Sequence, residues 1–249
     1  MEAFDDNEVQ PFVHEDESEV SLHFDICSVQ SRMRRADPFA LALDYTRTMM
    51  ACLLFCPRPA TMLMIGLGGG SLPKYCYRTL AQADITVVEI NRHVIAMRET
   101  FHVPRDDARF RVVHGDGAAF VHRPPRRYDV ILVDGFTWEG QAESLCTPEF
   151  YEDCRAALSD GGVLVANLHA DGEPCQRITE RIAQAFDGEL VVVTAAEGGN
   201  RVAFAGSARV ISCPDAALRH RLNTLAACHR WTLRDSVERV FGAVARLGA

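Results

Sequence analysis

The sequence lacks the features that place a chain in a membrane or on nucleic acid. No apolar run approaches the roughly 18 residues that a membrane-spanning helix needs, and no charged-then-apolar segment opens the chain. A basic excess is also missing, since the formal net charge is −8. An acidic balance argues against a nucleic-acid-binding surface. We therefore expect a protein with no membrane partner and no nucleic-acid partner.

Patterns for metal binding and for disulfides are absent as well. The nine cysteines are scattered along the chain. Cys52 and Cys56 are too far apart for a Cys-x-x-Cys pair, and no second pair completes a zinc site. An odd number of cysteines in a chain with a large core is typical of reduced thiols. We predict a cytoplasmic protein that uses no metal.

What the sequence has is an ordinary globular composition. Its 249 residues are 48% hydrophobic and 24% charged. This length suits one large α/β domain with extensions, or two small domains. No internal repeat or low-complexity segment suggests another architecture.

The stretch from Ala60 to Lys74, ATMLMIGLGGGSLPK, is the most informative part of the chain. An apolar run typical of a buried strand leads directly into Gly66, Gly68, Gly69 and Gly70, and a helix-compatible segment follows. Glycine allows positive φ angles and leaves no Cβ between the backbone and a ligand. A helix N-terminus presents free N–H groups and a partial positive charge. The pattern indicates a ligand-binding turn, although an ordinary strand–helix turn has the same composition.

Glu89 favours the ligand-binding interpretation. It ends a second apolar run, ITVVEI, about 20 residues after the glycines. An acid in that place is the usual acceptor for the hydroxyl pair of a ribose. The two features together predict a site for a nucleoside cofactor.

The apolar runs along the chain predict a Rossmann-like α/β fold. Strands that alternate with helices build a mostly parallel sheet with helices on both faces. Residues 190–194 and 201–205 are separated by only six residues, which is too short for a parallel crossover, so we expect an antiparallel hairpin there. A seven-stranded sheet that ends in such a hairpin is the layout of class I methyltransferases and related sulfonium-nucleoside transferases.

The segments around this sheet are expected to be extensions. We predict a solvated acidic segment over residues 1–19, a strand from Val20 to Gln30, a turn or short strand to Pro38, and a helix from Phe39 to Phe55. The resulting division is an N-terminal extension with short β-strands and a helix (1–55), a nucleoside-binding transferase domain (56–210) and a C-terminal helical extension (211–249).

From Leu22 to Leu168 the sequence resembles the spermidine synthase (polyamine aminopropyltransferase) family, and more closely its divergent, spermidine-synthase-like bacterial branch. The motifs that carry the resemblance are LHFDICSVQ, LDYTRTM, IGLGGGSLPK, VVEIN, HGDGAAF and YDVILVDGF. The resemblance implies a homodimer that transfers an aminopropyl group from decarboxylated S-adenosylmethionine to an amine, leaving methylthioadenosine. It also implies that Gln30 touches the cofactor ribose and that Tyr45 lies at the polyamine end.

Further roles follow from the positions of the motifs. Asp116 follows the strand expected over residues 109–114. Its carboxylate would accept from the adenine amine there, and Gly117 lets the backbone approach the ring. Asp134 ends the strand expected over residues 128–133, at the edge where open α/β sheets bind ligands. It would take a proton from the attacking amine or hold an ammonium group; capping a helix is the alternative. Trp138 in the following loop is a candidate lid.

Three departures from the family pattern fall on groups that would recognise cationic amines. Gly69 stands where the family has an aspartate for the cofactor amine. The fourth strand ends in Asp134-Gly135-Phe136-Thr137 and lacks a second acid, for which Glu139 or Glu143 are candidate substitutes. Tyr45 is followed by Thr46-Arg47, and an arginine close to a diamine would repel it. A methyltransferase that uses S-adenosylmethionine itself, and an inactive nucleoside binder, therefore stay open.

Overall fold

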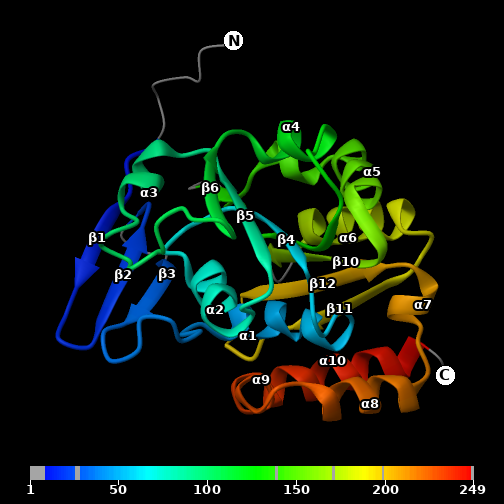
Figure 1. Cartoon of the computed structure of the whole chain (residues 1–249). Helices are drawn as coiled ribbons and strands as arrows, with labels where there is room; N and C mark the ends of the chain where they lie inside the picture. The colour runs from blue at the N-terminus through cyan, green and yellow to red at the C-terminus, as the bar shows by residue number, and fades with distance from the viewer. Residues whose placement is uncertain (1–8, 26–28, 138–139, 170–171, 198, 248–249) are drawn as a thin grey trace.

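The computed structural model describes residues 9–25, 29–137, 140–169, 172–197 and 199–247. At its centre is a sheet of seven strands in the order β11-β12-β10-β7-β4-β5-β6 (Figure 1). The strands are β4 (Thr61–Ile65), β5 (Asp84–Glu89), β6 (Phe110–His114), β7 (Tyr128–Val133), β10 (Leu158–His169), β11 (Leu190–Thr194) and β12 (Asn200–Gly206). Only β12 runs antiparallel to its neighbours, β10 and β11. The predicted mostly parallel sheet with a terminal hairpin is confirmed.

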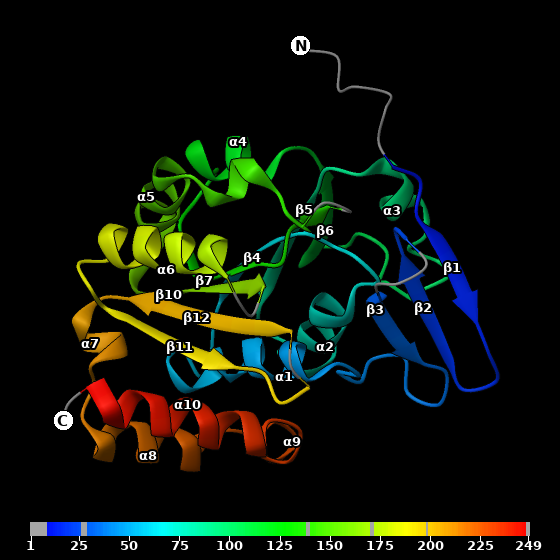
Figure 2. The same ribbon diagram turned by 180° about the vertical axis from the view of Figure 1, so that it is seen from behind.

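The central strands are apolar throughout because helices cover both faces of the sheet. In β4, Met62 and Met64 pack into one core cluster while Leu63 and Ile65 pack into the other. The first cluster lies under α1 (Asp44–Met50), α2 (Ser71–Thr79) and α10 (Arg234–Leu247), and the second under α4 (Gly117–His122), α5 (Pro148–Ala157) and α6 (Glu173–Ala185) (Figure 2). The two-residue alternation of a strand thus divides one sequence run between two cores.

The N-terminal region forms a separate antiparallel sheet of three strands, β1 (Phe12–Glu15), β2 (Glu19–His23) and β3 (Val29–Arg34). The predicted single strand over residues 20–30 and the solvated segment over 1–19 were therefore wrong in part. In β2 and β3 the buried side chains of Val20, Leu22 and Met33 face the core. The side chains of β1 are mostly exposed, and backbone pairing with β2 is what makes it a strand.

The helix after the N-terminal sheet differs from its predicted bounds. It was expected from Phe39 but begins only at Asp44, and it continues as a 3₁₀ helix, η1 (Ala51–Leu54). This difference lies at an element end, where a local pattern is weakest. Strand β10 begins at Leu158, with an irregularity in its pairing to β7 before Val163.

The remaining elements surround this core. They are α3 (Arg92–Ala96), the small hairpin β8 (Phe136–Thr137) and β9 (Gly140–Gln141), η2 (Glu143–Cys146), α7 (Ala208–Ile211), α8 (Asp215–Thr224) and α9 (Ala227–Thr232). In the part of the chain that the structure describes, no helix has the length and apolar character to cross a membrane.

Candidate active site

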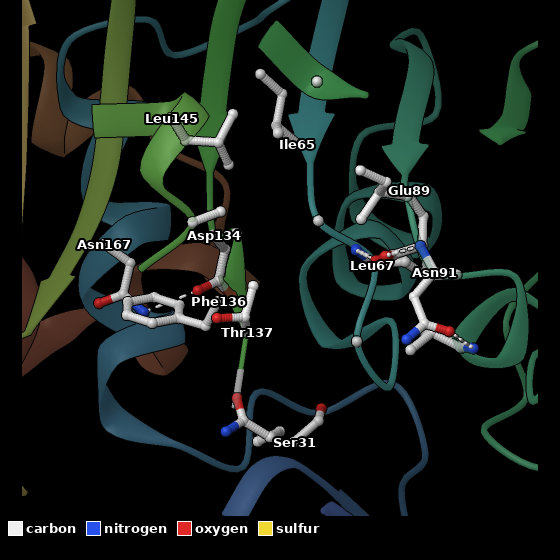
Figure 3. Close-up of a pocket in the computed structure, with 18 of the residues that line it drawn as sticks. Ser31, Ile65, Leu67, Glu89, Asn91, Asp134, Phe136, Thr137, Leu145 and Asn167 are labelled. Atoms are coloured by element: carbon white, nitrogen blue, oxygen red, sulfur yellow. Dashed lines mark hydrogen bonds between the residues drawn. The ribbon is translucent and has the colours of Figure 1, made fainter. Parts of the chain in front are cut away.

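A cavity of about 760 Å³ opens where the parallel strands of the large sheet end. This is the edge at which open α/β sheets bind their ligands. The glycine loop after β4 lies between two groups of polar side chains, and Figure 3 shows Asp134 and Asn167 in one group and Glu89 and Asn91 in the other. We call the first group the Asp134 side (Tyr45, Asp134, Thr137, Asn167, Asn200). We call the second group, together with two glycines beside it, the Glu89 side (Gly68, Glu89, Asn91, Asp116, Gly117).

The glycine loop brings the backbone of β4 close to that of β7. Gly66 has a φ of 99°, and a Cβ added there would lie 2.2 Å from the backbone oxygen of Asp134. No other residue satisfies both the left-handed conformation and this approach. Gly66 and Gly68 both line the cavity, and their role in ligand binding stays a prediction.

Glu89 ties the glycine loop to the end of β5. Its Oε2 accepts a hydrogen bond from the backbone N–H of Leu67 at 2.7 Å, and its Oε1 accepts from that of Asn91 at 2.8 Å. Burial raises the pKa of this carboxyl, while the N–H groups of Asn91 and Leu67 act in the opposite direction. The Glu89 carboxylate also lines the cavity, where it faces any ligand bound there.

Asp116, Gly117 and Gln30, for which we predict contacts with the cofactor, also line the cavity. Asp116 is the N-cap of α4, where its Oδ1 accepts from the backbone N–H of Ala118 at 2.9 Å. Gly117 begins that helix, and an added Cβ would lie 2.3 Å from Cγ2 of Ile65. Gln30 enters from β3 of the N-terminal sheet.

Gly69 and Gly70 do not line the cavity. A Cβ at Gly69 would lie 2.7 Å from Oγ of Ser31 and 2.9 Å from Cδ1 of Phe101, and one at Gly70 would meet Val103. The Phe101 segment is held in place by Lys74, the one lysine in the sequence, whose Nζ donates to the Phe101 carbonyl at 2.7 Å. Ser31 lines the cavity instead, so it occupies the space toward which an aspartate at residue 69 would point.

Asp134 is a half-buried carboxylate with one donor on each oxygen. The Tyr45 hydroxyl donates to its Oδ2 at 3.2 Å, and Nδ2 of Asn167 donates to its Oδ1 at 2.8 Å. Burial raises the pKa of Asp134, and the hydrogen bonds from Asn167 and Tyr45 offset only part of this. A two-residue strand of the β8–β9 hairpin follows, not a helix, so a helix-capping role has no support.

Asn167 and Asn200 are site residues that the sequence interpretation missed. Nδ2 of Asn200 donates to Oδ1 of Asn167 at 3.0 Å, which leaves the Asn167 amide group facing Asp134. Both residues line the cavity. The available signal was an asparagine inside the apolar run VLVANL of β10, because a buried amide needs a specific partner.

The concern that Arg47 would repel a cationic substrate is not supported. Its Nη1 donates to the carbonyl oxygens of Leu41 and Ala42, and its Nη2 lies 3.4 Å from Asp44 and 3.3 Å from Glu197. Arg47 is not among the residues that line the cavity. Its charge is therefore balanced outside the cavity.

The loop after β7 is described only in part. Trp138 and Glu139, the predicted lid and substrate-binding acid, lie outside the described residues. Thr137, where the family pattern has a second acid, lines the cavity, and its Oγ1 donates to the carbonyl of Gly140 at 3.2 Å. Glu143 is described in η2 but does not line the cavity.

Comparison with solved structures agrees with this architecture. A probable spermidine synthase from Corynebacterium glutamicum superposes with a TM-score of 0.69 at 18% identity, covering 92% of this chain and 91% of that one. The spermidine synthase from Thermotoga maritima gives 0.60 at 20% identity, with 78% and 71% covered. Human methyltransferase-like protein 13, in complex with SAH, gives 0.59 at 19% identity, with 80% and 92% covered. At such identities the likeness shows the Rossmann-like fold.

Comparison of sequences identifies the family. The chain is 39% identical over 181 residues to a polyamine aminopropyltransferase of Chromobacterium violaceum, covering 72% of this chain and 69% of that protein. It is 38% identical over 182 residues to polyamine aminopropyltransferases of Neisseria meningitidis, with 72% and 69% covered. Residues 44–194 match the model of the spermine/spermidine synthase domain. The chain therefore belongs to the spermine/spermidine synthase family.

Proposed function

We propose that this protein is an aminopropyltransferase of polyamine biosynthesis, with decarboxylated S-adenosylmethionine as the donor and a small amine as the acceptor. The observation that carries the proposal is the half-buried Asp134, held by Tyr45 and Asn167 in a cavity that Glu89 also lines. The family of the chain supports the same reaction, because its curated relatives are named polyamine aminopropyltransferases.

The Glu89 side suits the nucleoside. Glu89 would accept from the ribose hydroxyls and Asp116 would accept from the adenine amine, and both residues line the cavity. Gln30 would contact the ribose from the N-terminal sheet. The donor, when bound, supplies a carbon activated by its bond to a positively charged sulfur.

The Asp134 side suits the amine. Tyr45 and Asn167 fix the Asp134 carboxylate, so that it can hold the ammonium group and accept its proton. The neutral nitrogen then displaces the sulfur: a carbon–nitrogen bond forms, the carbon–sulfur bond breaks, and its electron pair stays on the sulfur. The residues contribute mainly by orienting the nitrogen in line and by excluding water.

A methyltransferase that uses intact S-adenosylmethionine is the second candidate. It is favoured by the surroundings of Gly69, where the hydroxyls of Ser31 and Ser71 lie 3.4 Å apart in place of a carboxylate. Such neutral surroundings suit the zwitterionic tail of S-adenosylmethionine better than a lone ammonium group.

Calorimetry together with a product assay tests the proposal. We expect tight binding of methylthioadenosine, weak binding of S-adenosylhomocysteine, and release of methylthioadenosine when decarboxylated S-adenosylmethionine and a diamine are added. The reverse order of affinities, with no such release, would favour the methyltransferase. Binding of neither nucleoside would contradict both candidates.

The pH dependence gives a further prediction. Asp134 must be ionised to accept a proton, so kcat should fall as the pH is lowered through its raised pKa, at a higher pH than for an ordinary aspartate. The Asn167 hydrogen bond favours the charged form. Asn167→Ala should therefore move the acidic limb of the kcat profile to still higher pH. Asn223→Ala, at an exposed position in α8, should leave it in place. An acidic limb that stays fixed or moves down in Asn167→Ala would contradict the role of Asp134.

We also propose that the protein acts in the cytoplasm as a homodimer. All eight cysteines within the described residues are free thiols, which is typical of a reducing compartment. The homodimer rests on the family resemblance.

The described residues hold no group of three or more metal-ligating side chains. The division into 1–55, 56–210 and 211–249 also remains a proposal.

A further inference from the structure

The C-terminal helix α10 reaches a buried polar cluster beside the active site. This helix lies outside residues 44–194, which match the family model. It packs against β11 and α1, as both views of the molecule show (Figures 1 and 2). Its Arg239 enters what we call the Asp44 cluster, which consists of Asp44, Thr48, Ser236, Arg239 and the backbone N–H of Ala196.

Short contacts hold the Asp44 cluster together. Oδ2 of Asp44 accepts from Nη2 of Arg239 at 2.7 Å and from the backbone N–H of Ala196 at 2.6 Å. The same Nη2 lies 2.9 Å from Oγ1 of Thr48 and 3.1 Å from Oγ of Ser236. Asp44, Thr48 and Ser236 are all buried. Three separate segments, α1, the turn after β11, and α10, therefore meet at one carboxylate.

The cluster stands directly behind the Asp134 side of the cavity. Asp44 immediately precedes Tyr45, which donates to Asp134. Ala196 lies in the turn that leads to Asn200, which orients Asn167. The Asp44 carboxylate thus fixes two segments. One reaches Asp134 through Tyr45, and the other reaches it through Asn200 and Asn167. The Glu89 side is held by contacts of its own, between Glu89 and the backbone of Leu67 and Asn91.

Arg239 is needed because the Asp44 carboxylate is buried. Burial raises the pKa of Asp44, but the Ala196 N–H and Arg239 more than offset it, so the pKa lies below the ordinary value and the group stays charged. Without Arg239, the buried carboxylate keeps Arg47 as a cation 3.4 Å from its Oδ1, but its Oδ2 loses the shorter bond of 2.7 Å. The neighbouring segments would relieve this loss by moving or by admitting water. Here the neighbouring segments carry Tyr45 and Asn200.

We infer that Arg239 is a positioning residue for the amine acceptor, through which the C-terminal helix sets the geometry of the Asp134 side without touching the nucleoside. This inference rests on the proposed function, because it assigns the Asp134 side to the acceptor. It gives the C-terminal segment a role in the reaction, separate from the nucleoside-binding core.

Arg239→Gln tests the inference. We expect the KM for the amine to rise about tenfold, the effect of losing charge-assisted hydrogen bonds of ordinary strength. The Kd for methylthioadenosine, measured by calorimetry, should stay within about twofold of the wild-type value, because Arg239 shares no hydrogen-bond partner with the Glu89 side and sites without shared partners behave nearly independently. Arg234→Gln is the matched control. It removes the same charge from the same helix, but its partner Glu238 lies 3.7 Å away and both side chains are largely exposed, so neither quantity should change.

Separate outcomes distinguish failure of the inference from failure of the proposed function. An unchanged KM, or a loss of methylthioadenosine affinity by the same factor as the rise in KM, would overturn the positioning role. Absence of methylthioadenosine release by the wild-type protein would contradict the proposed function instead. If Arg239→Gln does not fold, Arg239→Lys keeps the charge with fewer donors, and it should show the same selective rise in KM to a smaller extent. No selective rise there would also count against the inference.

Discussion

Replacing Asp134 with asparagine should lower kcat for aminopropyl transfer by a factor on the order of 10³, the size expected for loss of a general base. Asparagine has nearly the same shape, and its amide oxygen can still accept a hydrogen bond. It cannot accept a proton, and it offers no charge to an ammonium group. Because the proposed nucleoside contacts lie on the Glu89 side, the Kd for methylthioadenosine should change little.

The measurement is release of methylthioadenosine under saturating donor, together with calorimetry of its binding. Asp129→Asn is a suitable control, since Asp129 lies on the same strand, β7, and accepts from the backbone N–H groups of Ala60 and Thr61 at 2.8 and 3.0 Å. It does not line the cavity, so its replacement should leave kcat unchanged. Unchanged turnover in Asp134→Asn would remove this residue from the mechanism.

Glu89→Gln should weaken methylthioadenosine binding about a hundredfold. Both oxygens of Glu89 accept from backbone N–H groups, so a glutamine must turn its NH₂ group toward either Leu67 or Asn91. A donor facing a donor in a buried place costs about 1–3 kcal/mol, and the ribose hydroxyls lose a charged acceptor as well. A loss of about 2.7 kcal/mol corresponds to the hundredfold change.

Calorimetry with methylthioadenosine measures this loss. Glu99→Gln provides the control, since Glu99 also lies near α3 but is largely exposed, with Arg105 as an exposed partner. Its replacement should not affect binding. A wild-type affinity in Glu89→Gln would show that the ribose is bound elsewhere, and the nucleoside assignment of this side would fail.

The large sheet and the Glu89 side were predictable because their signals are local. The glycine loop, Glu89, and the turn with Asp116 each lie at or directly after the carboxyl end of a strand, and parallel strands bring these ends to one edge. The antiparallel hairpin followed from the length of one connection. In these places the residues that signal the structure are neighbours in the sequence.

The Asp134 side was less predictable because its geometry depends on contacts distant in sequence. The sequence around Asn167 and Asn200 does not show that they meet. They come together only when β10 pairs with β12, and the Asn167 amide then donates to Asp134. Arg47 was expected to disturb the substrate, and only the folded chain shows its partners. Strand β1 was not predicted because its side chains are mostly exposed and show no strand pattern. Its backbone pairing with β2 is what makes it a strand.

The contact between Gly69 and Ser31 limits the evolutionary paths open to this protein. The φ of Gly69 is not positive, so the backbone would accept an aspartate there. The obstacle is steric, because Oγ of Ser31 and the Phe101 ring already fill that space. An aspartate at residue 69 would therefore require the side chains of both Ser31 and Phe101 to move. The choice of residue in the glycine loop is in this way linked to the N-terminal sheet, since Ser31 belongs to β3.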